Sequence, residues 1–65
     1  AAHRTLRAKV AELPEKLRDV IVLCSFENKS YQQASEILEI PIGTVSSRMN
    51  RGMCLLREAL KVLAK

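Results

Sequence analysis

The stretch SYQQASEILEIPIGTVSSRMNRG, residues 30–52, decides the fold of this chain. Within it, Ser30 is followed three residues later by Gln33. This spacing is typical of a capping box, in which each side chain accepts a hydrogen bond from the other residue's backbone N–H at the start of a helix. The pattern therefore predicts a short helix over residues 31–38. The side chains expected to face inward are those of Tyr31, Ala34, Ser35 and Leu38.

The next three residues, Glu39-Ile40-Pro41, break this helix, because a residue that precedes proline disfavours the α region. A longer helix is predicted to start within residues 42–44 and to continue, since no further breaker follows. One face of it is expected to carry Val45, Met49, Met53, Leu56, Leu60 and Leu63, with Gly52 on the same side. A short helix, a tight turn and a longer helix form the helix–turn–helix arrangement.

Two further helical segments precede this unit. Residues 5–12 place apolar side chains at helical spacing, and Pro14 then suits the first turn of a helix expected to end near residues 25–27. No stretch alternates apolar and polar residues long enough to predict a strand. The predicted fold is all-α, a small four-helix domain with a C-terminal helix–turn–helix. Its core is expected to contain Val20, Ile21, Leu38, Val45, Met49 and Leu56.

The composition limits the classes of function. Sixty-five residues leave room for one domain, and the first residue is Ala, so we expect residues 1–65 to be a piece of a longer protein. A net charge of +4, from 11 Lys and Arg against 7 Asp and Glu, favours an anionic partner, nucleic acid before membrane. No secretory signal is visible, and no apolar run is long enough to span a membrane.

Nothing in the sequence is typical of catalysis or metal binding. Cys24 and Cys54 belong to no C-x-x-C motif and His3 is the single histidine, so we expect no metal and no cofactor. We expect both cysteines to be reduced, in a cytoplasmic protein. Without paired carboxylates or a glycine-rich phosphate loop, the chain is not expected to be an enzyme.

Four motifs together resemble one protein family. They are LPEKLRDV at residues 13–20, SYQQ at 30–33, IPIGTVSSRM at 40–49, and Arg51 followed by LLREAL at 55–60. They resemble region 4 of the extracytoplasmic-function (ECF) sigma factors of bacteria, and the string P-x-G-T-V-x-S-R is the most specific of them. The resemblance extends over about residues 10–60, nearly the whole chain.

The resemblance implies a function and partners. It implies a DNA-binding domain that recognises the −35 promoter element for transcription initiation by RNA polymerase in the bacterial cytoplasm. It also implies docking on the β flap of the RNA polymerase core, and inhibition by an anti-sigma factor that covers the domain.

Helix geometry selects the residues that would read DNA bases. With Val45 pointing inward and about 100° per residue, four residues near the helix start share the outward arc. They are Ser46, Ser47, Asn50 and Arg51. Arginine can donate two hydrogen bonds to guanine and asparagine can pair with adenine, and the N-terminal part of a recognition helix enters the major groove. By the resemblance, these four match the base-contacting positions of the family.

A second group is expected to contact the DNA backbone. The helix that precedes the recognition helix crosses the phosphates, and free N–H groups at a helix start attract them. The expected backbone contacts are Lys29, Tyr31, Gln32, Gly43, Thr44 and Arg48.

Three positions depart from the family pattern. Glu39 stands where members often have glycine, at a turn position that usually needs a positive φ. Ser35 replaces a frequent alanine, and its hydroxyl can bond to a carbonyl one turn earlier. Ser46 replaces a frequent basic residue, which is expected to change promoter preference and weaken attraction to DNA.

Two alternatives remain open at this point. One is the DNA-binding effector domain of a LuxR-type response regulator, which has a similar short helix and recognition helix and dimerises on a palindromic site. The other is a helical module that only binds proteins, through the apolar stripe over residues 14–26.

Overall fold

The computed structural model describes residues 2–63, and side chains from 6 to 61. Its helices are α1 (Ala2–Ala11), α2 (Glu15–Ile21), the π-helical turn η1 (Val22–Phe26), α3 (Tyr31–Leu38) and α4 (Ile42–Leu63). No strand occurs among residues 2–63, so the all-α prediction is confirmed. The boundaries predicted for the third and fourth helices agree with α3 and with the start of α4, whereas α1 begins before the predicted residue 5.

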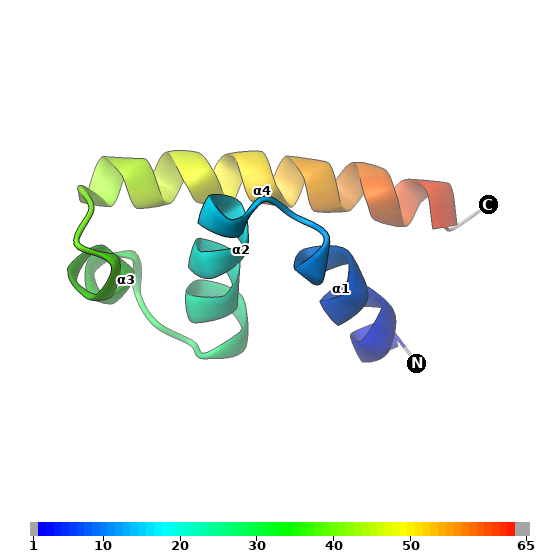
Figure 1. The fold of residues 1–65 in the computed structure, drawn as a ribbon, viewed down its shortest axis with the longest axis horizontal. Helices are drawn as coiled ribbons and strands as arrows, with labels where there is room; N and C mark the ends of the chain where they lie inside the picture. Colours follow the sequence, from blue (N-terminus) through cyan, green and yellow to red (C-terminus); the bar gives the residue numbers. More distant parts are fainter. Residues whose placement is uncertain (1, 64–65) are drawn as a thin grey trace.

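The long helix α4 is in contact with each of the other three α-helices. It runs along one side of the molecule, and α1, α2 and α3 all pack against it (Figure 1). The molecule is elongated along this helix, with extents of 38 × 19 × 16 Å. α3 lies at the N-terminal end of α4, α2 follows, and α1 packs nearest the C-terminal half (Figure 1).

The core lies between α4 and the three α-helices that pack against it. Its buried residues are Val10, Val20, Ile21, Ala34, Val45, Met49 and Leu56. Five of the six predicted core residues are therefore confirmed, and the sixth, Leu38, is half-buried against the same cluster. Gly52 is buried on the inner side of α4, as predicted, and it lets Ile21 of α2 approach the helix closely.

Two residues expected to face inward do not. Met53 is 43% exposed and Tyr31 is 40% exposed. Met53 points away from the core because of the helix geometry. Each step of four residues turns the side-chain direction by about 40° more than one full turn, so two such steps from Val45 turn Met53 away from the core side of α4. Tyr31 is the first residue of α3, and the helix reaches the core only at Ala34, three residues later.

The second predicted helix ends in an unforeseen way. After Ile21 the backbone changes to π-helical hydrogen bonding, with the Glu27 N–H donating to the Val22 carbonyl at 3.0 Å. Asn28 then takes a left-handed conformation at φ 57°, and the Lys29 N–H donates to the Leu23 carbonyl at 2.9 Å. The wider turn ends the helix and directs the chain toward α3.

Candidate nucleic-acid interface

The capping box predicted at the start of α3 is present. The Gln33 N–H donates to Ser30 Oγ at 3.0 Å, and the Ser30 N–H donates to Gln33 Oε1 at 2.8 Å. These two bonds satisfy N–H groups that the first turn of a helix leaves without partners. They fix where α3 begins, and so where Tyr31 and Gln32 stand.

The turn between α3 and α4 is held by Ser35. Glu39 adopts the left-handed conformation expected of its position, with φ 57° and ψ 46°, and its N–H donates to the Ser35 carbonyl. The Ile40 N–H donates to the same carbonyl at 3.1 Å. The sequence allows the Ser35 hydroxyl to bond to a carbonyl one turn earlier in its own helix. In the structure it donates forward instead, to the Ile40 carbonyl at 2.6 Å.

The first turn of α4 leaves fewer free N–H groups than predicted. The Pro41 carbonyl accepts from the Thr44 N–H at 2.9 Å and from the Val45 N–H at 3.2 Å. Thr44 therefore cannot offer a free N–H to phosphate, and that expectation was wrong. Gly43 is exposed, and its N–H has no backbone partner within the described chain.

We call Ser47, Asn50 and Arg51 the outer arc of α4. All three are exposed, while Val45 and Met49 on the opposite side are 0% and 8% exposed. Within residues 6–61, no side chain of the outer arc makes a hydrogen bond or an ion pair with the protein. Ser46 is half-buried and lies at the edge of this arc rather than within it.

The residues expected to contact phosphate lie on either side of the turn. Tyr31 and Gln32 are exposed at the start of α3, and Lys29 just before them is half-buried. The Gln32 amide donates to Glu36 Oε1 at 3.2 Å, and this contact is exposed. Figure 1 shows α3 beside the N-terminal end of α4, so these residues and the start of α4 belong to one end of the molecule.

The charge is unevenly distributed over this surface: α4 is basic up to Glu58, whereas α3 and the turn after it carry the exposed Glu36 and Glu39. Between Glu39 and Glu58 the chain carries Arg48, Arg51 and Arg57 and no acidic residue. Arg48 is half-buried on the flank of α4. The ion pair that the described residues do form, Lys9 with Glu12 at 3.5 Å, lies on α1 and the turn after it, outside this surface.

Among the described residues, no three His, Cys, Asp or Glu side chains lie close enough together to hold a metal ion. Nor does any helix between residues 2 and 63 combine the length and apolar character of a membrane span.

The short helix α3, the tight turn after it and the long helix α4 form a helix–turn–helix arrangement. Residues 3–61 match the family model described as Sigma-70, region 4. The chain belongs to this family, which confirms the resemblance seen in its motifs. Region 4 of a sigma factor is a DNA-binding regulatory domain and not an enzyme family.

Several curated relatives are sigma factors. The chain is 44% identical over 59 residues to the ECF RNA polymerase sigma factor SigW of Bacillus subtilis, covering 91% of this chain and 32% of that protein. It is 40% identical over 55 residues to the ECF RNA polymerase sigma factor SigE of Mycolicibacterium smegmatis, covering 85% and 21%. It is 34% identical over 61 residues to the RNA polymerase sigma-H factor of Pseudomonas aeruginosa, covering 94% and 32%. The chain thus spans a third or less of the length of these relatives.

Proposed function

We propose that this domain recognises the −35 promoter element for transcription initiation, with α4 in the major groove of the DNA. The observation that carries the proposal is the outer arc: Ser47, Asn50 and Arg51 are exposed near the start of α4, with no protein partner among the described residues. Ser46 stands at the edge of the groove-facing surface, where its short side chain allows close approach. The relatives named as ECF sigma factors support the same function.

The test compares Arg51→Ala with wild type on a promoter duplex and a scrambled duplex at one salt concentration. Because arginine can pair with guanine through two hydrogen bonds, the variant should lose about 1–3 kcal/mol of binding free energy on the promoter and far less on the scrambled duplex. Asn50→Ala should show a smaller selective loss. Lys61→Ala is the control, since Lys61 is an exposed cation about 15 Å further along the helix axis.

Equal losses of Arg51→Ala on both duplexes would assign this residue to phosphate contact. No loss of affinity on either duplex would mean that α4 does not enter the major groove of the DNA, and it would favour a purely protein-binding module. A preference for palindromic sites, bound by a dimer, would favour the response-regulator alternative.

Contacts to the DNA phosphate backbone can be distinguished from base contacts by how affinity depends on sequence and salt. We propose that Lys29, Tyr31, Gln32, Gly43, Thr44 and Arg48 contact phosphate, with Thr44 acting through its side chain because its N–H is already bonded. Removing Arg48 should weaken binding equally on all sequences and lower the slope of log affinity against log salt by about one. A loss confined to the promoter duplex would instead make Arg48 a base-reading residue.

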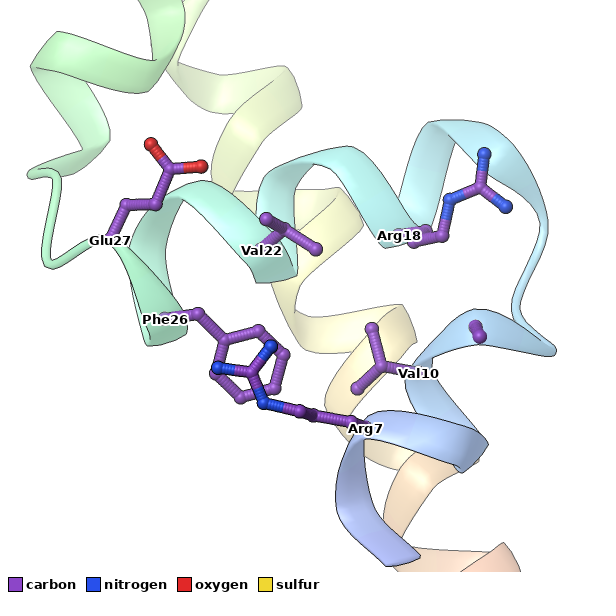
Figure 2. A pocket seen from close by; sticks show the side chains of 7 residues that line it. Arg7, Val10, Arg18, Val22, Phe26 and Glu27 are labelled. Carbon is purple, nitrogen blue, oxygen red and sulfur yellow. The ribbon is translucent and has the colours of Figure 1, made fainter. Parts of the chain in front are cut away.

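The same proposal includes docking on RNA polymerase. A groove of about 310 Å³ lies between α1 and α2–η1, and no described residue of α4 lines it. Its floor contains Val10, Val22 and Phe26, and Arg7 lies over the Phe26 ring at 4.8 Å from the ring centre (Figure 2). We propose that the β flap of the polymerase core docks here, which leaves the outer arc free for DNA. An anti-sigma factor that covers this groove would block that docking in the bacterial cytoplasm.

Charge reversal tests the docking site. Arg18 lines the groove, whereas Lys16 on the same helix is exposed outside it. Arg18→Glu should weaken binding of an isolated β-flap fragment measured by calorimetry, and Lys16→Glu, with the same change in net charge, should not. Equal effects of the two variants would show that only overall charge matters and would place the flap elsewhere.

A further inference from the structure

One side-chain hydrogen bond of the described chain crosses the α3–α4 turn. Ser35 binds the peptide groups on either side of the Ile40 Cα atom, since its carbonyl accepts the Ile40 N–H at 3.1 Å and its hydroxyl donates to the Ile40 carbonyl at 2.6 Å. One residue on the second turn of α3 thus binds both polar backbone groups of Ile40.

We propose that Ser35 is a positioning residue for base reading: its hydroxyl fixes the placement of α4 relative to α3. This inference rests on the proposed DNA-binding function. Ser35 touches no DNA in this scheme. It acts through Ile40 and Pro41, the two residues that lead directly into α4.

The turn requires such support for two reasons. Glu39 stands at φ 57°, a region that costs free energy for any residue with a Cβ atom, so this turn is less favoured than it would be with glycine. The Ile40 carbonyl also lies outside both helices, on a half-buried residue, and needs a partner. The Ser35 hydroxyl supplies that partner and favours the observed turn over other conformations.

The turn matters for reading because it joins two surfaces that must engage DNA together. Phosphate contacts from the start of α3 set the register, and the outer arc of α4 then meets particular base edges. Only molecules with the observed turn can make both sets of contacts. When a fraction of molecules is competent, the apparent dissociation constant rises by the reciprocal of that fraction.

This argument gives the expected size of the effect. One hydrogen bond of ordinary net strength shifts an equilibrium about fivefold. Ser35→Ala should therefore weaken binding to the promoter duplex by up to about fivefold. Binding to a scrambled duplex relies on charge and tolerates variation in the turn, so it should change much less.

The experiment measures both affinities for wild type, Ser35→Ala and two controls, at a temperature where circular dichroism shows every protein folded. Ser25→Ala removes the same hydroxyl from an exposed residue of η1 for which the described chain shows no side-chain hydrogen bond. Val10→Ala destabilises the domain from α1, where Val10 is 2% exposed, without touching the turn. If Ser35→Ala does not fold, Ser35→Cys replaces it, because a thiol of similar size is only a weak donor.

A loss of promoter preference in the Ser35 variant, with preference intact in both controls, supports the inference. Faster hydrogen exchange at the Ile40 amide, with the central amides of α4 unchanged, is the accompanying structural signature. Unchanged preference in the Ser35 variant overturns the inference and leaves the proposed function standing. A similar loss in Val10→Ala would mean that general stability is responsible, and also overturns it. A wild-type protein that prefers no duplex overturns the proposed function and this inference with it.

Discussion

Replacing Gly52 by alanine tests how closely α2 and α4 pack. A Cβ atom at this position would overlap Ile21 Cδ1 and stand 3.2 Å from Ile21 Cγ1 and 3.8 Å from Leu17 Cβ. Ile21 is 1% exposed, so its side chain has little room to rotate away. Overpacking of this kind costs about 1–3 kcal/mol. Alanine in place of glycine within a helix returns about 1 kcal/mol. The net loss of unfolding free energy should therefore be about 1 kcal/mol, or about 4–8 °C in Tm for a domain of this size.

A second substitution isolates the clash. Ile21→Val deletes the Cδ1 atom and alone should cost about 0.5–1.5 kcal/mol. In the double variant the alanine methyl group occupies the space that the valine vacates, so stability should return close to that of wild type. The two changes should thus couple by at least about 1 kcal/mol in a double-mutant cycle of urea unfolding followed by circular dichroism. Additive effects within about 0.5 kcal/mol would refute the packing argument.

Gly43→Ala provides the matched control. A Cβ atom at Gly43 meets no atom within 4 Å, so the same chemical change adds helix propensity without a clash. It should stabilise the domain by up to about 1 kcal/mol. A destabilised Gly43→Ala would show that the loss at Gly52 does not come from contact with Ile21.

Three further predictions concern other parts of the fold. Val45→Asp should abolish the cooperative thermal transition, because Val45 is 0% exposed and a buried unpaired carboxylate costs several kcal/mol; a normal melting curve would contradict the position of Val45 in the core. Glu39→Gly should raise stability by about 1 kcal/mol in urea unfolding, since glycine adopts the φ of 57° without a Cβ penalty; a decrease would mean that the Glu39 side chain stabilises the turn. Iodoacetamide should modify exposed Cys54 before half-buried Cys24, because burial raises the pKa of the Cys24 thiol and lowers its reactive thiolate fraction at a given pH. Mass spectrometry of the labelled protein would show the order of modification, and labelling of Cys24 first would contradict this prediction.

Local signals in the sequence predicted much of the fold, because each depends on a few neighbouring residues. Ser30 and Gln33 alone form the capping box. Pro41 separates α3 from α4 through its effect on the neighbouring backbone, which does not depend on distant residues. The outer arc could be predicted for the same reason, since Val45 in the core determines where Ser47, Asn50 and Arg51 point. The positive φ of Glu39 was implied by the family resemblance, because members often have glycine at that position.

Other features depend on information that a hydrophobic pattern lacks. Residues 22–26 are mostly apolar, and five residues cannot distinguish α-helical from π-helical hydrogen bonding. The direction of the Ser35 hydroxyl depended on the position of the Ile40 carbonyl across the turn, which no spacing rule supplies. The groove beside Phe26 required the placement of α1 against α2, and the contact of Arg7 with Phe26 joins residues from two separate helices.

The independence of the outer arc has an evolutionary consequence. Within the described chain, the side chains of Ser47, Asn50 and Arg51 contribute no hydrogen bond, ion pair or core packing to the domain. Mutations at these positions can therefore accumulate without unfolding the protein, while the inner side of the same helix keeps Val45 and Met49 under selection for packing. A duplicated copy of this domain could acquire a new binding preference in single steps, each passing through a stable intermediate. The same separation makes these three positions the natural choice for a library that randomises specificity on an unchanged scaffold.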